Sequence, residues 1–235
     1  MRVIASLCLI AGLVCTAAQA NEAEVRKNMQ ARYPGIPVES VARTPLPGIY
    51  EVYAGGIVIY TDEKVNYLIA EGRLVDANTR TDLTAERLRK LRAIAFSSLP
   101  LNQSFTIVRG NGKRKLAYFA DPNCGYCKRF EQDILSISDI TVHVFLYPIL
   151  SQDSMDKARS VWCSKDRARA WNDMMLKGVA PTTPGTCDTP IDKIVQYGRE
   201  KGISGTPTLI LADGSRVPGA IDAAALVKLM DEAAK

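Results

Sequence analysis

The sequence lacks the compositional biases that mark disordered or fibrous proteins. Its 235 residues are 47% hydrophobic and 23% charged, with 16 glycines and 12 prolines, which excludes an intrinsically disordered or collagen-like chain. Charge of one sign is also scarce: 30 Lys and Arg face 25 Asp and Glu, and the formal net charge of +5 permits anionic partners without requiring them. A chain of this length can bury a core without disulfides, so the 6 cysteines need another explanation.

The N-terminal hydrophobic run is too short for a typical membrane-spanning helix. Residues 3–14 are apolar, fewer than the roughly 20 that a span needs, and the small residues Ala18 and Ala20 follow them. This order predicts a secretory signal peptide over residues 1–20 that is cleaved after Ala20. A membrane anchor is the alternative, and a lipoprotein at Cys15 is disfavoured because valine precedes that cysteine. Export would deliver the chain to an oxidising compartment, where disulfides persist.

Removal of this signal separates the cysteines into two groups. Cys8 and Cys15 would leave with the signal peptide. The mature chain would keep four cysteines: Cys124, Cys127, Cys163 and Cys187.

The first part of the mature chain predicts a small α+β domain over residues 21–80. A short helix ends at Pro34-Gly35, and a proline-rich connection follows. Four segments then have strand patterns, with Gly55-Gly56 as a hairpin turn between the first two: 49–53, 57–60, 65–70 and 73–76. A meander of this size is marginally stable alone, so we expect it to lean on a second copy or on a neighbouring domain.

A charged helix over residues 83–99, within a linker at 81–99, is predicted between this domain and the next. Its apolar residues share one stripe, and the stripe is too narrow to favour the alternative of a membrane-surface helix. The basic segment 109–115 is read as a solvated turn rather than a nucleic-acid site, because no aromatic residues are interleaved with it.

From residue 100 to 235 the pattern alternates between strands and helices. A strand at Leu116–Ala120, a helix at 124–135 and a nearly all-apolar strand at 142–147 predict a βαβ unit in an α/β domain. Further elements are expected as follows: helices at 154–164, 166–176 and 191–201, a hairpin at 208–217 and a last helix from Asp222.

The motif that indicates a reactive site is Cys124-Gly125-Tyr126-Cys127, at the junction between a predicted strand and helix. Residues three apart share a helix face, so the two cysteines can pair reversibly. Free N–H groups and the dipole at a helix N-terminus favour a thiolate, which makes Cys124 the expected nucleophile. Cys127, one turn further along, is then the resolving thiol.

Two other interpretations of this motif are weaker. A zinc site would need a second close pair of ligands, but Cys163 and Cys187 are far apart and the single histidine, His143, lies within a predicted strand. No metal is therefore expected. An inert disulfide does not need a position directly after a βα turn.

Cys163 and Cys187 suit a structural disulfide that closes a loop containing the proline-rich segment 179–190. A second redox pair is the alternative, although the two are not closely spaced. Ser204-Gly205-Thr206-Pro207 precedes a predicted strand, and periodicity alone leaves open whether Pro207 is an ordinary strand start or follows a cis bond.

Taken in order, these motifs resemble the DsbC/DsbG family of periplasmic protein disulfide isomerases, whose catalytic domain has the thioredoxin fold. The resemblance is carried by five segments: CGYC at 124–127, VWCSKD at 161–166, GTCD at 185–188, SGTP at 204–207 and VPG at 217–219. It implies an α+β N-terminal dimerisation domain joined by the linker helix to an α/β thioredoxin-like domain with a helical insertion.

The resemblance also implies function and partners. It makes Cys124 and Cys127 catalytic, assigns substrate binding to Tyr126, Thr206 and Pro207 with Pro207 cis and facing the CxxC motif, and requires no cofactor. It implies a periplasmic homodimer with an apolar cleft for misfolded or mis-oxidised exported proteins. A DsbD-type membrane reductase would keep the two catalytic cysteines reduced, and no nucleic-acid partner is expected. A DsbG-like sulfenic acid reductase and a protein that is chiefly a dimeric chaperone are the alternative functions.

One departure concerns proton transfer. Some thioredoxins have a buried carboxylate in the strand before the motif, whereas residues 116–119 here contain none. The sequence therefore leaves the proton acceptor for Cys127 unassigned.

Overall fold

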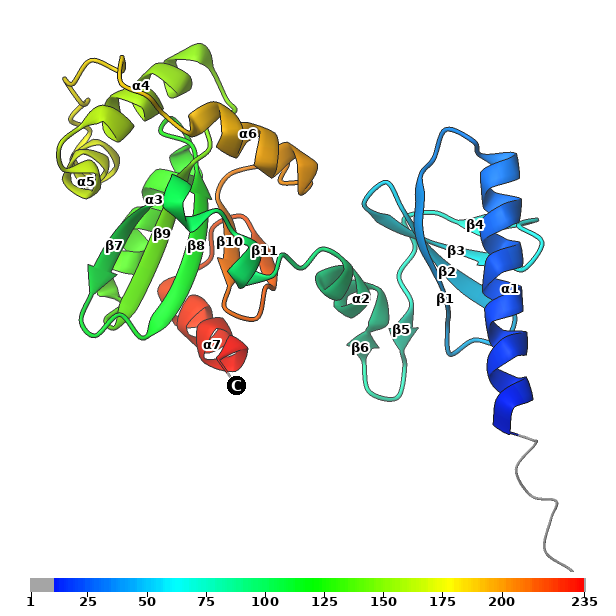
Figure 1. The fold of residues 1–235 in the computed structure, drawn as a ribbon. Helices are drawn as coiled ribbons and strands as arrows, with labels where there is room; N and C mark the ends of the chain where they lie inside the picture. Colours follow the sequence, from blue (N-terminus) through cyan, green and yellow to red (C-terminus); the bar gives the residue numbers. More distant parts are fainter. Residues whose placement is uncertain (1–10, 235) are drawn as a thin grey trace, which may run out of the picture. The chain divides into compact units, whose positions relative to one another are not determined.

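The computed structural model describes the backbone of residues 11–234 and the side chains of residues 21–234. The chain divides into two compact units, Met1–Leu91 and Arg92–Lys235 (Figure 1), and each is described by itself. Of the predicted signal peptide, residues 1–10 lie outside the described residues, and residues 11–20 are helical. Among the described helices, none has the length and apolar character needed to cross a membrane.

The N-terminal unit has a four-stranded antiparallel sheet in the order β1-β2-β3-β4 and a separate pair, β5-β6. Its elements are α1 (Ala11–Arg32), β1 (Val38–Arg43), β2 (Ile49–Ala54), β3 (Ile57–Asp62), β4 (Leu68–Ile69), β5 (Val75–Asp76), β6 (Thr81–Asp82) and α2 (Leu83–Leu91). The predicted hairpin is confirmed, because Gly55 and Gly56 turn between β2 and β3 with φ values of 59° and 81°. Two consecutive positive φ angles favour glycine and match the twist of the flanking strands.

Two strand predictions for this unit are wrong. The proline-rich connection contains β1, which pairs with β2 as an edge strand because Pro37 and Pro45 flank it without interrupting the ladder. Residues 73–76 do not extend the meander, since Val75 and Asp76 pair with β6 instead. The chain turns after β4 at Glu71, whose φ of 58° is incompatible with a continuing strand.

Both faces of the N-terminal sheet are covered by helices of the same unit. On one face, Val25 and Met29 of α1 pack with Val52 and its neighbours. On the other face, Leu88 and Leu91 of α2 pack against a cluster that includes Tyr53. This burial on two sides explains why β2 and β3 are nearly continuous apolar runs.

The predicted linker helix is shorter than expected. The helix α2 ends at Leu91, whereas a helix to residue 99 was predicted. After Leu91 the chain enters the second unit, where Ile94 is buried and its N–H donates to the carbonyl oxygen of Gly214 at 2.9 Å. A continued helix would carry that N–H away from Gly214, and residues 96–98 instead form a short 3-10 helix.

The second unit is built on a five-stranded sheet in the order β11-β10-β8-β9-β7, with β8 and β9 parallel and the other pairs antiparallel. Its strands are β7 (Phe105–Arg109), β8 (Arg114–Ala120), β9 (Ile140–Leu146), β10 (Thr208–Leu211) and β11 (Arg216–Pro218). Its α-helices are α3 (Gly125–Asp133), α4 (Gln152–Cys163), α5 (Arg167–Lys177), α6 (Ile191–Glu200) and α7 (Ala223–Ala233). The predicted βαβ unit is confirmed, whereas β7 was missed despite alternating burial along it.

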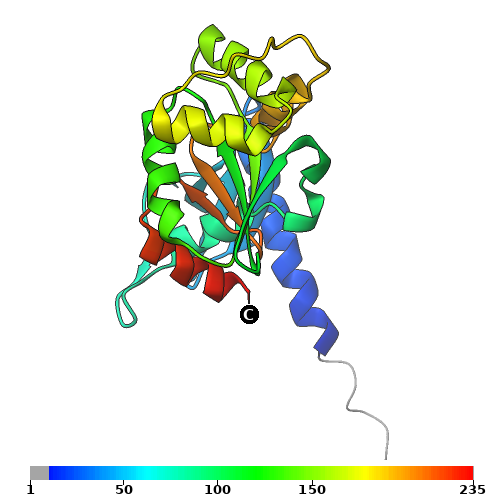
Figure 2. The same ribbon diagram turned by 90° about the vertical axis from the view of Figure 1, so that its left-hand side faces the viewer.

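Helices cover both faces of this sheet, which is visible edge-on in Figure 2. Neighbouring residues of β8 point to opposite faces: Tyr118 contacts Phe130 of α3 and Trp171 of α5, whereas Phe119 stacks on Tyr197 of α6. The central strand β8 is therefore buried on both sides, and the chain leaves its carboxyl end to enter α3. The CxxC motif lies at this exit.

Candidate active site

Cys124 lies at the N-terminus of α3, directly after the turn that leaves β8. It is the N-cap residue of that helix, and its Sγ accepts a hydrogen bond from the backbone N–H of Cys127 at 3.3 Å. Its own N–H donates to the carbonyl oxygen of Asp121 at 3.1 Å. The cap position directs the sulfur toward the free N–H groups of the first helical turn, where negative charge is stabilised.

The surroundings of Cys124 favour its thiolate. Hydrogen bonds from the side chains of Cys127 and Thr206 lower the pKa of the Cys124 thiol from 9.0 to about 6, against the opposing effect of burial. Cys124 is 5% exposed, so only a small part of this residue reaches solvent. A thiol with this pKa is mostly ionised at neutral pH, and the thiolate is the form that attacks a disulfide.

Cys127 has the opposite environment. It is fully buried in α3, and burial raises the pKa of its thiol. The Tyr118 hydroxyl donates to the Cys127 carbonyl oxygen at 3.3 Å. Both cysteines are free thiols in this structure. One exchange-competent thiolate next to one protonated, buried thiol is the arrangement expected of an attacking and a resolving pair.

A loop that is distant in sequence completes the site. The Thr206–Pro207 peptide bond is cis, and the Cys124 sulfur lies 3.2 Å from the Thr206 carbonyl oxygen, to which the thiol donates in its protonated form. Pro207 is buried and directly precedes β10, which pairs with β8. The pairing of these two strands thus brings the 204–207 segment beside the CxxC motif.

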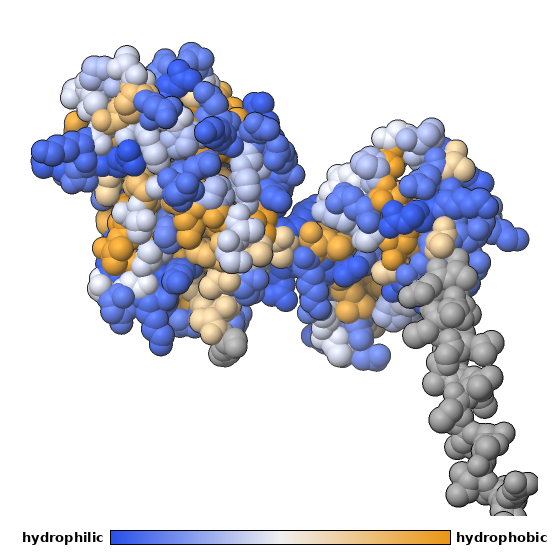
Figure 3. Space-filling view, viewed as in Figure 1, coloured by the Kyte–Doolittle hydropathy of each residue, from blue (hydrophilic) through white to orange (hydrophobic). Residues whose placement is uncertain are grey.

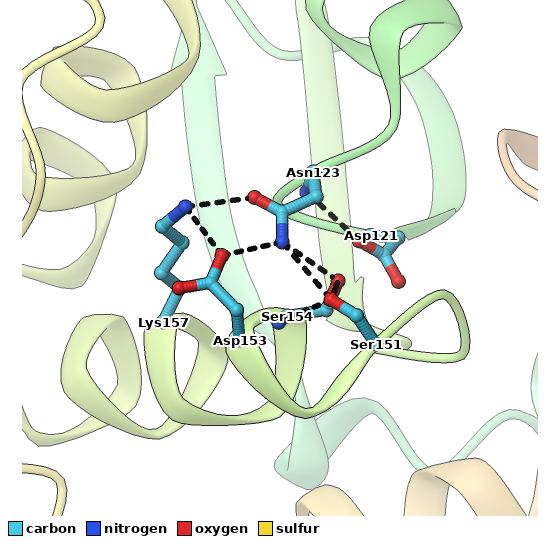
Figure 4. Close-up of polar contacts among 6 residues, drawn as sticks. All are labelled: Asp121, Asn123, Ser151, Asp153, Ser154 and Lys157. Atoms are coloured by element: carbon cyan, nitrogen blue, oxygen red, sulfur yellow. Dashed lines mark hydrogen bonds and ion pairs between the residues drawn. The ribbon is translucent and has the colours of Figure 1, made fainter.

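The turn that presents Cys124 is fixed by a polar network (Figure 4). Asp121 is fully buried, and its carboxylate accepts hydrogen bonds from the backbone N–H groups of Asn123, Ile149 and Leu150 at 2.8, 2.8 and 2.9 Å. The amide nitrogen of Asn123 donates to three side chains at the start of α4: Ser151, Asp153 and Ser154. The turn is therefore tied to the loop after β9 and to α4.

The remaining predicted residues lie outside this cluster of contacts. Tyr126 is adjacent in sequence, but its side chain is 69% exposed and extends into solvent. Cys163 and Cys187 form a disulfide with a Cα–Cα distance of 5.7 Å, which joins the end of α4 to the loop before α6.

Three residues of the site region were missed at the level of sequence. Asp121 and Asn123 belong to Asp-Pro-Asn directly before the motif, a combination typical of turns whose side chains bond the backbone. Glu131 lies four residues after Cys127 and is fully buried. A carboxylate on the apolar side of a helix was the available signal for it.

The described residues contain no group of three or more His, Cys, Asp or Glu side chains that could hold a metal ion. The chemistry described for this site depends on the two sulfurs and their neighbours.

Two family models match the chain. Residues 16–85 match the disulfide bond isomerase protein N-terminal domain, and residues 101–234 match the thioredoxin-like domain. The mixed α/β fold with two different domains agrees with both matches.

Named relatives and a solved structure agree with these matches. A probable thiol:disulfide interchange protein DsbC from Bordetella pertussis is 44% identical over 84% of this chain and 70% of its own length. The thiol:disulfide interchange protein DsbC of Escherichia coli K12 is 25% identical over 92% of this chain and 89% of its own length. The crystal structure of a disulfide interchange protein from Neisseria gonorrhoeae is 38% identical, covers 57% of this chain and 97% of that one, and has a TM-score of 0.55.

The CxxC motif at the start of α3 and the two domain matches agree, and this chain belongs to the DsbC family of thiol:disulfide interchange proteins.

Proposed function

We propose that this protein is an isomerase that reshuffles incorrect disulfides in exported proteins, with Cys124 as the attacking thiolate. The observation that carries the proposal is the position of Cys124 at the cap of α3, where hydrogen bonds, first of all the one from the Cys127 side chain, lower its pKa to about 6. A thiol with this pKa combines a high thiolate fraction with useful nucleophilicity near neutral pH.

The reaction exchanges bonds between sulfurs without net oxidation. The Cys124 thiolate attacks one sulfur of a substrate disulfide, a mixed disulfide forms, and the second substrate sulfur leaves with the electron pair and is protonated. A different substrate thiolate then attacks the substrate sulfur of the mixed disulfide. The new substrate disulfide forms and Cys124 leaves as a thiolate.

Cys127 would release substrates that do not rearrange. Its thiolate attacks the sulfur of Cys124, the Cys124–Cys127 disulfide forms, and the substrate sulfur leaves with the electron pair and takes up a proton. The enzyme is then oxidised by two electrons and needs an external reductant. We assign that role to a dithiol protein, a membrane reductase of the DsbD type.

Substrate binding is assigned to the residues around Cys124. The Thr206 carbonyl oxygen contacts the Cys124 sulfur, and we assign the backbone of Thr206 and Pro207 to binding an extended peptide beside the nucleophile. Tyr126 offers an exposed aromatic ring beside the nucleophile. The disulfide between Cys163 and Cys187 has a structural role in this proposal, because it lies at the end of α4.

We also assign residues 21–80 to dimerisation and residues 100–235 to catalysis, with residues 81–99 between them. Support for a homodimer comes from β4, the end strand of the N-terminal sheet within the described residues. The side chains of Tyr67, Leu68 and Ile69 are 80%, 36% and 54% exposed. Exposed apolar residues on a sheet edge are a common interaction surface, and Figure 3 shows apolar residues on the surface of this unit among hydrophilic ones.

Export to the periplasm and chaperone activity complete the proposal. The small-residue sequence that ends at Ala20 supports cleavage of a leader, and an oxidising compartment supplies substrates with disulfides. Apolar surface shared by two protomers would hold unfolded segments while their disulfides rearrange.

The recovery of active ribonuclease from its scrambled, fully oxidised form tests the isomerase function. We expect activity from the reduced protein and from Cys127→Ala, which keeps the nucleophile, and none from Cys124→Ala. Equal recovery with Cys124→Ala would contradict the assignment of the nucleophile. Suppressed aggregation of a cysteine-free client by Cys124→Ala/Cys127→Ala would identify chaperone activity, and reduction of a sulfenic acid without ribonuclease recovery would favour the reductase.

A further inference from the structure

Glu131 is a buried carboxylate that the exchange reaction, as described so far, does not use. It lies on α3 one turn after Cys127, and both residues are fully buried. Residues four apart on a helix share a face. The carboxylate and the resolving thiol therefore lie on the same buried side of α3.

Only one of the two carboxylate oxygens of Glu131 accepts a hydrogen bond among the described residues. Its Oε1 accepts a hydrogen bond from the indole N–H of Trp171 at 2.5 Å. Among the described residues its Oε2 has no hydrogen-bond partner, although it is buried. An unpaired buried carboxylate oxygen is costly in stability, and such an atom in a native structure calls for an explanation.

Tyr118 contacts the resolving cysteine directly and also packs against Trp171, the residue that is hydrogen-bonded to Glu131. Its hydroxyl donates to the carbonyl oxygen of Cys127, and it also forms a hydrogen bond with the Cys127 side chain, which lowers the pKa of that thiol against the larger raising effect of burial. Burial raises the pKa of Tyr118 well above its usual value, and the negative charges of Cys127 and Glu131 add to this effect. Tyr118 thus interacts with both groups.

We propose that Glu131 accepts the proton of Cys127, passed through the Tyr118 hydroxyl, when Cys127 displaces a substrate from Cys124. The inference rests on the proposed function, because it concerns the release step of that reaction. The Tyr118 hydroxyl, which donates to the Cys127 carbonyl oxygen in this structure, turns toward the unpaired Oε2 of Glu131, gives it a proton and receives the proton of Cys127. The Cys127 thiolate then attacks Cys124, and the substrate sulfur leaves with the electron pair.

The location of Cys127 makes such an internal acceptor useful. The thiol is fully buried, so bulk water does not reach its proton. The acceptor needs a pKa near the working pH, and burial raises the pKa of Glu131 to about 7, opposed by the Trp171 hydrogen bond and the positive charge of Arg109. The ionisable groups that act on this carboxylate and thiol are Arg109 on β7, Tyr118 on β8 and Cys124 at the start of α3.

This carboxylate also replaces the one that is missing from β8. Residues 116–119 contain no Asp or Glu, and the position that contacts Cys127 from that strand is occupied by Tyr118. In this chain the carboxylate belongs to α3 instead, and in our proposal it takes the proton of the Cys127 thiol through Tyr118 of β8.

Single-turnover kinetics test the proposal. Reduced protein is mixed with a peptide disulfide, quenched with acid and analysed by mass spectrometry, which separates formation of the mixed disulfide from its conversion to the Cys124–Cys127 disulfide. For Glu131→Gln we expect an unchanged first step and a second step slowed roughly 100-fold, within the usual contribution of a general base. The wild-type second step should rise with pH through a midpoint near 7, set by the Glu131 carboxylate that burial shifts, and Glu131→Gln should lack this midpoint.

Further variants separate proton transfer from a structural role. Tyr118→Phe should slow the same step. The double variant Tyr118→Phe/Glu131→Gln should be no slower than the slower of the two single variants, because both residues act in one path. Glu131→Asp, which keeps a carboxylate, should retain the inflection, and Asp133→Asn on the same helix should behave as wild type. An unchanged second step with its pH profile intact in Glu131→Gln would overturn this inference alone. A wild type that forms no mixed disulfide would overturn the proposed function as well.

Discussion

The thiol of Cys124 donates a hydrogen bond to the carbonyl oxygen of Thr206 at 3.2 Å, although the two residues are 82 positions apart in sequence. This contact exists because β10 pairs with β8, so the segment before one strand lies beside the segment after the other. The nucleophile thus faces the backbone that we assign to substrate binding. The pKa of Cys124 depends on the same neighbourhood.

The rate of alkylation of Cys124 should report its lowered pKa. The pKa of about 6, set first by the hydrogen bond from Cys127, means that the thiolate persists above pH 6 and is lost as the pH falls through that value. The rate with iodoacetamide should therefore be constant above pH 7 and fall about tenfold per pH unit well below 6. Cys127 is fully buried, so Cys124 is the thiol that reacts. A midpoint near 9 would contradict this assignment.

Two matched variants rank the causes of that shift. Cys127→Ala removes the hydrogen bond with the largest effect, and Thr206→Val removes a smaller one while keeping the shape of the side chain. Both should move the alkylation midpoint of Cys124 to higher pH, and Cys127→Ala should move it further.

The sequence was sufficient for the local part of this site and insufficient for the rest. The position of Cys124 at a helix start follows from neighbouring residues, since an apolar strand and an amphipathic helix meet there. The proximity of Thr206 depends on strand pairing across the domain, and spacing alone did not decide between a strand start and a cis proline at Pro207. The family resemblance, rather than periodicity, pointed to that contact.

The errors in the fold have similar physical origins. The strand β1 was missed because its flanking prolines look like a linker, although proline is compatible with the ends of an edge strand. The helix α2 was drawn too long because Ile94 continues its apolar stripe, whereas in the structure that residue is buried with the second unit. Periodicity identifies which residues are buried, but it does not identify the domain that buries them.

Removal of the disulfide between Cys163 and Cys187 should reduce stability and leave the nucleophile intact. The bond closes a loop with a sequence separation of 24, for which the chain-entropy estimate is about 3.5 kcal/mol. The double variant Cys163→Ala/Cys187→Ala should lose roughly that free energy of unfolding in urea and should keep the alkylation profile of Cys124. A changed profile would indicate that this pair acts on the redox site.

Association of two chains should depend on the exposed edge of β4. Ile69 is 54% exposed there, and a lysine at this position would add a charge to a sheet edge that we assign to the homodimer. Ile69→Lys should shift the mass in sedimentation equilibrium from dimer toward monomer. Val108→Lys is the control, because Val108 is an equally apolar residue with 58% exposure in the second unit. A monomeric wild type, or dissociation by both variants, would contradict the assignment of this edge.

Glu131 should make the stability of the protein depend on pH in a direction that is unusual for a carboxylate. Burial raises its pKa from 4.5 to about 7 in the folded state, so its contribution is fully present below pH 4.5 and is lost as the pH rises through 7. Glu131→Gln stays neutral and keeps an oxygen for the Trp171 N–H. Its free energy of unfolding, compared with wild type, should therefore rise from pH 4.5 to pH 8, by up to roughly 3 kcal/mol at 1.36 kcal/mol per pKa unit. Denaturant unfolding of the reduced proteins at both pH values checks this, with Asp133→Asn as the control for losing a carboxylate from α3. If the two proteins differed in free energy of unfolding by the same amount at both pH values, the pKa of Glu131 would be the same in the folded and unfolded states. That result would remove the electrostatic reason for choosing Glu131 as the proton acceptor.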